Sequence, residues 1–175
     1  MRGTERLAVV EATTPRMERA IPDLPTDTAL MVRLIRITLY GMGQYFEPVF
    51  RDIGMNESSF HALCLLVSND RGSAYPADLA ELVGVTRANM TRILDGMVGR
   101  GLATRETDAL DGRRAVIRVT AAGRKAVREG VPKLAIPLKA AFAEFTEEEF
   151  RQFDYLLRKL ILSFDKGVIA RLTAA

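Results

Sequence analysis

The sequence predicts a mainly α-helical fold with one small β wing, and three observations support this class. Apolar residues recur at helical spacing over most of the 175 residues. Residues 102–119 instead alternate in polarity and carry β-branched residues on both sides of a turn rich in Asp and Gly. Two short helical segments, 76–83 and 86–100, are separated by a glycine. Together these features predict a winged helix-turn-helix domain with further helices before and after it.

Residues 1–25 mix charged side chains with three prolines, Pro15, Pro22 and Pro25. Proline interrupts regular helix, so we expect a flexible or partly helical N-terminal extension. It is either a disordered leader or a segment that adds a contact to DNA or to a second subunit.

A long helix is expected to begin at Thr26 or Asp27 and to run to about Arg51, because an apolar stripe recurs along it. Gly54 should end it, since glycine tolerates the left-handed backbone of a helix end. Asn56 then offers a side-chain oxygen to cap the next helix, residues 59–67.

The helix-turn-helix prediction rests on Gly84, at the sharp turn, and on Thr86, which can cap the second helix. That helix has an apolar face for the core, made of Met90, Ile93, Leu94 and Met97. Gly101 should stop it. The wing follows as a two-stranded hairpin around the turn at 108–114.

Positive charge is concentrated in this part of the chain. Between Thr86 and Arg128 there are ten basic and four acidic residues, a net charge of +6 in a chain of +3 overall. A basic excess confined to one module is typical of nucleic-acid binding.

Thr120 should cap a further helix to about Glu144, which Pro132 and Pro137 should kink or break. Thr146 and Glu149 form a capping box for the last helix. Its apolar face is wider than one domain of this size needs, which predicts a homodimer. The expected organisation is residues 55–120 as the DNA-binding domain, with 26–54 and 121–170 as the dimerisation region.

The stretch from about Asn56 to Val127 resembles the MarR family of bacterial transcriptional regulators. The similarity lies in Leu79-Ala80-x3-Gly84-Val85-Thr86-Arg87, Gly101-Leu102, Asp111-x-Arg113-Arg114 and Val119-Thr120-x2-Gly123. The resemblance implies a dimeric repressor of a palindromic double-stranded DNA operator.

The second helix of the motif should lie in the major groove. Arg87 and Arg92 are expected to pair with guanine and Asn89 with adenine, while Thr86 and Thr91 contact phosphate or only cap and pack. For Arg92, a solvated position on the helix surface or an internal pair with Asp95 or Asp111 is the alternative. The resemblance gives Arg113 the place of the wing arginine, held by a charge-assisted bond from Asp111. Arg114 is adjacent, so either arginine can take that role.

Many members of the family bind small aromatic acids, which implies an effector such as a hydroxybenzoate or hydroxynicotinate. The expected lining residues are Arg36, Tyr40, Tyr45 and His61, which offer rings or charge to a phenol or carboxylate. Helix packing is the alternative role for the tyrosines, and a structural role for His61, the sole histidine.

The composition argues against an enzyme, a metal site or a cofactor. His61 and Cys64 are single residues of their kinds and cannot supply the roughly four ligands of zinc. A single cysteine, the lack of a long apolar run and the lack of a signal core predict a cytoplasmic protein that does not enter the membrane. A winged-helix module for protein interaction, without a specific DNA target, remains the alternative function.

Overall fold

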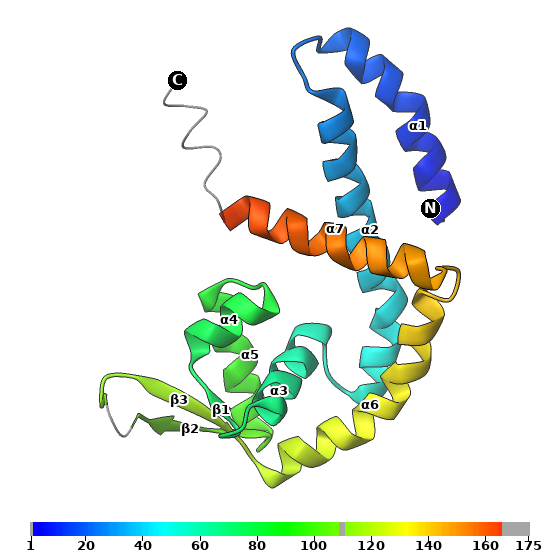
Figure 1. The fold of residues 1–175 in the computed structure, drawn as a ribbon. Coiled ribbons are helices and arrows are strands. Elements are labelled where there is room, and N and C mark those ends of the chain that lie inside the picture. Colours follow the sequence, from blue (N-terminus) through cyan, green and yellow to red (C-terminus); the bar gives the residue numbers. More distant parts are fainter. Residues whose placement is uncertain (1, 109–110, 166–175) are drawn as a thin grey trace. The chain divides into compact units, whose positions relative to one another are not determined.

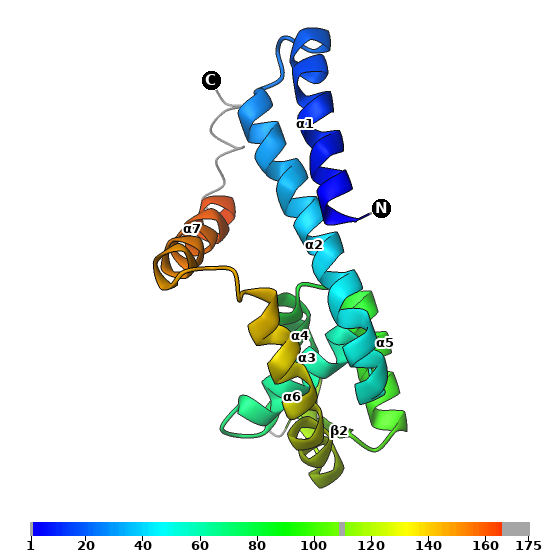
Figure 2. The same ribbon diagram turned by 90° about the vertical axis from the view of Figure 1, so that its right-hand side faces the viewer.

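The computed structural model describes residues 2–108 and 111–165 (Figures 1 and 2). The helices are α1 (Gly3–Ala20), α2 (Thr26–Ile53), α3 (Glu57–Ser68), α4 (Pro76–Val83), α5 (Arg87–Gly99), α6 (Ala121–Ala141) and α7 (Glu147–Asp165). The strands β1 (Ser73–Ala74), β2 (Ala103–Thr107) and β3 (Ala115–Val119) form an antiparallel sheet in the order β1–β3–β2. The predicted class, mainly helical with a small wing, is confirmed.

Helix α1 occupies most of the segment for which the sequence predicted a flexible or partly helical extension. It lies beside α2 in both views (Figures 1 and 2). Val10 is buried, the Arg33 guanidinium donates to the Thr13 hydroxyl at 2.9 Å, and Arg6 lies over the Tyr40 ring at 4.6 Å. These side-chain contacts compensate for Pro15 inside the helix.

Helix α2 begins directly after Pro25 without a side-chain cap, rather than at a cap provided by Thr26 or Asp27. It ends as predicted at Gly54, whose φ of 78° is left-handed. Near that end Phe50 packs between Phe46 and Phe60, with ring centroids 6.4 and 6.0 Å apart. The predicted cap of α3 is confirmed, because the Asn56 side chain accepts from the Ser59 amide at 2.8 Å.

The turn between α4 and α5 forms as the sequence predicts. Gly84 has a φ of 74°, and the Thr86 hydroxyl accepts from the Asn89 amide at 3.2 Å to cap α5. The predicted apolar face of α5 is buried in full: Met90, Ile93, Leu94 and Met97. Burial of this stripe sets which side of α5 remains in solvent.

The sheet differs from the predicted hairpin by one strand. Strands β2 and β3 pair from Ala103↔Val119 to Thr107↔Ala115. On the other edge of β3, Ser73 pairs with Arg118, and Ala74 with Ile117. A two-residue strand has no periodicity of its own, so the sequence pattern did not reveal it.

The start of α6 is attached closely to the wing. Thr120 caps it by accepting from the Gly123 amide at 3.0 Å, and its own hydroxyl donates to the Gly101 carbonyl at 2.7 Å. A Cβ on Gly123 would lie 2.2 Å from the Leu102 carbonyl oxygen. The sequence predicted a kink or a break at Pro132 and Pro137, and the helix is not broken at either proline. Each proline removes one hydrogen-bond donor, and the neighbouring turns remain helical.

The chain forms two compact units that meet between Val131 and Pro132. In the second unit, rings of Phe142 and Phe145 contact Phe150 and Phe153 of α7, with centroids 5.6 and 5.8 Å apart. These pairs hold the end of α6 against the start of α7.

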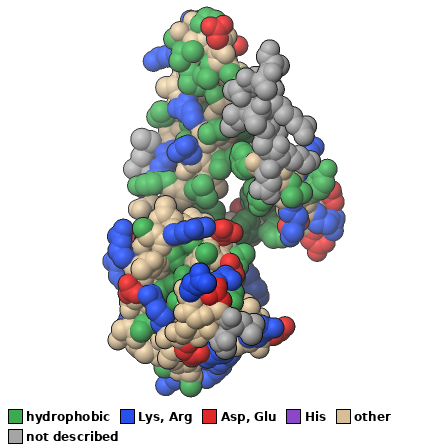
Figure 3. Space-filling view, turned by 90° about the vertical axis from the view of Figure 1, so that its left-hand side faces the viewer, with side chains coloured by type: hydrophobic (Ala, Val, Ile, Leu, Met, Phe, Trp, Pro, Cys, Tyr) green, Lys and Arg blue, Asp and Glu red, His purple; other side chains and the backbone are tan. Residues whose placement is uncertain are grey.

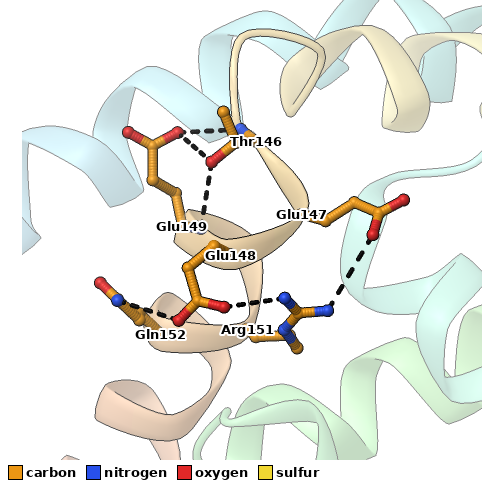
Figure 4. Close-up of polar contacts among 6 residues, drawn as sticks. All are labelled: Thr146, Glu147, Glu148, Glu149, Arg151 and Gln152. Carbon is orange, nitrogen blue, oxygen red and sulfur yellow. Dashed lines mark hydrogen bonds and ion pairs between the residues drawn. The ribbon is translucent and has the colours of Figure 1, made fainter.

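The predicted capping box at the start of α7 is confirmed (Figure 4). The Thr146 amide donates to the Glu149 carboxylate at 2.8 Å, and the Glu149 amide donates back to the Thr146 hydroxyl at 3.3 Å. The backbone bond from Thr146 lowers the pKa of Glu149 below its ordinary value. Glu147 and Glu148 both lie within 4.0 Å of Arg151, so the acidic run serves the helix start.

We expect Gly123→Ala to destabilise the first unit by about 1–3 kcal/mol, because the added methyl group overlaps a backbone oxygen. The measurement is the denaturation midpoint in urea. Gly96→Ala is the matched control: it also lies inside a helix, but its added methyl group meets nothing within 4 Å. The control should be neutral or stabilised by up to about 1 kcal/mol through helix propensity. Equal midpoints for both variants would contradict the close contact.

Candidate nucleic-acid interface

The face of α5 opposite its buried stripe is polar. Arg87, Thr91 and Arg92 are exposed on it and Asn89 is half-buried. The Thr91 hydroxyl donates to the Arg87 carbonyl at 3.0 Å, and Thr86 uses its oxygen as the helix cap. Both threonines therefore have local roles, whereas the arginines project from a rigid helix.

Arg92 does not make the internal pair considered from the sequence. Asp95 pairs with Arg105 of β2 at 2.6 Å instead. Asp111 bonds within its own turn. Among the described residues no ion pair involves Arg92, so its guanidinium is available to an external acceptor.

Asp111 has a different role from the predicted one. Its carboxylate accepts from the backbone amide of Arg113 at 3.1 Å, and its carbonyl accepts from the Arg114 amide at 2.9 Å. A short acidic side chain in a turn commonly reaches the amide two residues ahead. Asp111 therefore orders the turn backbone, and the prediction that it holds the Arg113 guanidinium is wrong.

Arg114 is held by an aromatic ring that the sequence reasoning did not single out. Its guanidinium lies 3.7 Å from the ring centroid of Tyr75, the residue before α4. The Tyr75 hydroxyl donates to the Asp108 carboxylate, and this bond is the main cause of the raised pKa of Tyr75. Asp108 also accepts from the Asp111 amide at 3.1 Å. Tyr75 and Asp108 are 33 residues apart, and no local pattern links them.

Two open grooves flank α5. One, of about 310 Å³, lies between the start of α4, the start of α5 and the wing, and it is lined by Tyr75, Pro76, Ala77, Arg87, Thr91, Arg114 and Ala115. The other, of about 620 Å³, lies between α5 and the α2–α3 junction. Arg51, Arg92 and Arg100 line it, together with Asn56 and Asn89. Both grooves are therefore basic and share residues with the exposed face of α5.

Part of the positive charge in this module is neutralised internally. Arg118 pairs with Glu106 across the sheet at 3.1 Å and donates to the Arg71 carbonyl; the bond from Arg118 lowers the pKa of Glu106. Lys125 lies 3.7 Å from Glu129. In Figure 3 basic side chains accordingly alternate with acidic and apolar ones over the lower part of the molecule.

The four predicted effector residues do not line either groove. Arg36 and Tyr40 are exposed on α2, Tyr45 packs edge-on against Phe46 with centroids 4.9 Å apart, and His61 is exposed on α3. The structure therefore does not bring them together in one of these cavities.

Cys64 is half-buried, and its partial burial raises the pKa of its thiol. Within residues 2–108 and 111–165, no three His, Cys, Asp or Glu side chains lie close enough to hold a metal ion. Nor does any helix in that part of the chain have the length and apolar character needed to cross a membrane.

Comparisons with known proteins agree with this geometry. The model of the MarR family matches residues 53–114. The transcriptional repressor MprA of Escherichia coli K12 is 28% identical over 144 residues, which cover 82% of each chain.

Two solved structures share the fold at lower identity. Sco3205 of Streptomyces coelicolor, a MarR family regulator solved in complex with DNA, has a TM-score of 0.72 at 20% identity, covering 79% of this chain and 88% of its own. BpsR of Bordetella bronchiseptica, whose DNA binding is regulated by 6-hydroxynicotinic acid, has a TM-score of 0.66 at 24% identity. The match covers 73% of this chain and 89% of the BpsR chain. The matched segment, residues 53–114, contains α4, α5 and the motif residues Asp111 and Arg113, and this part of the chain is similar to the MarR family.

Proposed function

We propose that the protein is a dimeric, sequence-specific repressor that a small aromatic acid releases from its operator. The observation that carries the DNA-binding part is the exposed polar face of α5. Arg87, Asn89 and Arg92 project from a helix whose opposite face is anchored in the core. Such a helix fits the major groove of double-stranded DNA. A repressor that acts on bacterial DNA works in the cytoplasm.

The contacts divide into two classes under this proposal. Asn89 and Arg92 read base edges, since amides pair with adenine and guanidinium groups with guanine. Arg113 contacts the backbone from the wing, because its exposed side chain lies next to an ordered turn. Thr86 and Thr91 support α5 through their local bonds and offer a hydroxyl to a neighbouring phosphate.

The dimer proposal rests on α7. None of its described side chains is buried, although Phe150, Leu157, Ile161 and Phe164 share one face. A solvent-exposed apolar face of this extent is costly, and a second copy of the chain can cover it. A two-fold dimer also presents two α5 helices to the half-sites of a palindrome.

The effector proposal rests on residue chemistry and on similarity. Arg36, Tyr40, Tyr45 and His61 supply charge and rings for an aromatic carboxylate or phenol, and we place the effector among them. BpsR, which shares the fold, responds to 6-hydroxynicotinic acid. The effector acts only if it binds the DNA-incompetent arrangement more tightly, and its effect cannot exceed that difference in affinity.

The DNA contacts can be tested by comparing Arg92→Ala with Arg113→Ala on a selected operator and on unrelated DNA. Arg92→Ala removes the proposed base contact, so it should weaken binding to the operator by about 1–3 kcal/mol and relax the preference at one base pair. Arg113→Ala removes the proposed phosphate contact, so it should weaken binding to all sequences alike. It should also reduce the salt slope, the change of log affinity with log salt concentration, by about one.

Fluorescence anisotropy over a range of salt concentrations gives both the affinity for each DNA and the salt slope. Lys139→Ala is the control, because it removes one charge at an exposed position of α6. This variant should bind DNA like the wild type. A wild-type protein with no sequence preference would favour a protein-interaction module instead.

The dimer should dissociate when charge is placed on the shared apolar face of α7. We expect Ile161→Asp to reduce the mass from about twice 19.4 kDa towards 19.4 kDa in light scattering at low micromolar concentration. Tyr155→Asp is the matched control, because Tyr155 is 63% exposed, like Ile161 at 61%, but lies off that face. A monomeric wild type, or equal dissociation in both variants, would contradict this interface.

Hydroxybenzoates and hydroxynicotinates should release the protein from DNA, and His61→Ala should shift the half-release concentration upward. His61 can pair with a carboxylate as imidazolium or bond a ring hydroxyl as imidazole. The experiment titrates each acid into the DNA complex, with acetate as a control that has the charge but no ring. An unchanged response in His61→Ala removes His61 from the site, and no release by any of these acids refutes the aromatic effector.

A further inference from the structure

The cluster of Tyr75, Asp108 and Arg114 joins the two ends of the DNA-binding module. Tyr75 precedes α4, while Asp108 and Arg114 stand on either side of the wing turn, where the Asp108 amide donates to the Arg114 carbonyl at 2.8 Å. The Tyr75 hydroxyl bonds Asp108 and its ring face supports Arg114. One aromatic side chain thus connects the residue before α4 to the two residues that flank the wing turn.

This arrangement leaves Arg114 able to bind an anion. A guanidinium that stacks on a ring uses its flat face, so its N–H groups still point outward in the plane. The hydrogen bond to Asp108 leaves electron density on the Tyr75 ring, which favours the stacked cation. Arg114 lines the groove of about 310 Å³ together with Arg87, and none of the described residues that line it is acidic.

We propose that Tyr75 is a positioning residue for DNA binding, which holds Arg114 beside Arg87 so that both guanidinium groups contact one backbone phosphate in this groove. The inference rests on the proposed DNA binding and adds a phosphate contact between α5 and the wing. It also separates the roles of the adjacent arginines: Arg114 binds the backbone from a fixed position, whereas no aromatic ring among the described residues supports the Arg113 guanidinium.

The test uses the salt dependence of DNA binding, because Tyr75 carries no charge. If Tyr75 only fills space, Tyr75→Leu weakens binding and leaves the salt slope unchanged. If it positions Arg114, Tyr75→Leu should reduce the slope by up to about one, as Arg114→Ala does. The affinity should fall by the same factor for operator and unrelated DNA.

A double-mutant cycle gives the second measurement. In the Arg114→Ala background, Tyr75→Leu should have little further effect, since the group it positions is already gone. Tyr75→Phe keeps the ring and loses the bond to Asp108, so its effect should lie between wild type and Tyr75→Leu. Lys139→Ala again controls for the loss of one charge away from the module.

The outcomes separate cleanly. If Tyr75→Leu keeps the wild-type salt slope, or if its effect adds to that of Arg114→Ala, the positioning role is overturned. The proposal that the protein binds DNA is not affected by either result. A wild-type protein that binds no DNA overturns the proposed function and this inference together. Should circular dichroism show that Tyr75→Leu is unfolded, Tyr75→Phe in the same cycle decides: coupling with Arg114→Ala supports the inference and additivity refutes it.

Discussion

The burial of one helical stripe determines the rest of the DNA-binding module. Met90, Leu94 and Met97 of α5 are almost completely removed from solvent, as are Leu63, Leu66 and Ile117 from α3 and β3. Burying a side chain of this size stabilises a fold by about 1.5–3 kcal/mol. Rotation of α5 about its axis would expose this stripe, so the polar face has one orientation. The buried apolar residues of α5 therefore fix the direction in which its arginines project.

Much of this arrangement could be predicted from local sequence. Gly84, Thr86 and Asn56 act at the turn and caps where their backbone and side-chain chemistry requires them. The capping box at Thr146 was equally visible, because both partners lie within four residues. Short-range signals of this kind depend on neighbouring residues alone, and they predict helix boundaries well.

Contacts between distant residues were not predictable in the same way. The packing of α1 depends on Arg33 and Tyr40 of α2, and the short strand β1 exists only because β3 passes beside it. Tyr75 gave no signal, since its partners are far away in the chain. The signal from Asp111 was misleading. A carboxylate close to an arginine in sequence suggested an ion pair, whereas the carboxylate accepts from a backbone amide. Base-reading and effector residues require a bound partner for their assignment.

The bond from Asp111 to the backbone has a consequence for how the wing adapts. The Asp111 carboxylate accepts the backbone amide of Arg113, so this bond does not fix the Arg113 guanidinium, which belongs to an exposed residue. Immobilising such a side chain costs about 0.5–1.5 kcal/mol at the moment of association. Under the proposed DNA binding, a guanidinium that is not fixed in advance can follow grooves of different width without distorting the hairpin. The proposed wing contact would then lose some affinity and gain tolerance of variation in DNA shape, while the proposed base contacts of α5 keep a stricter geometry.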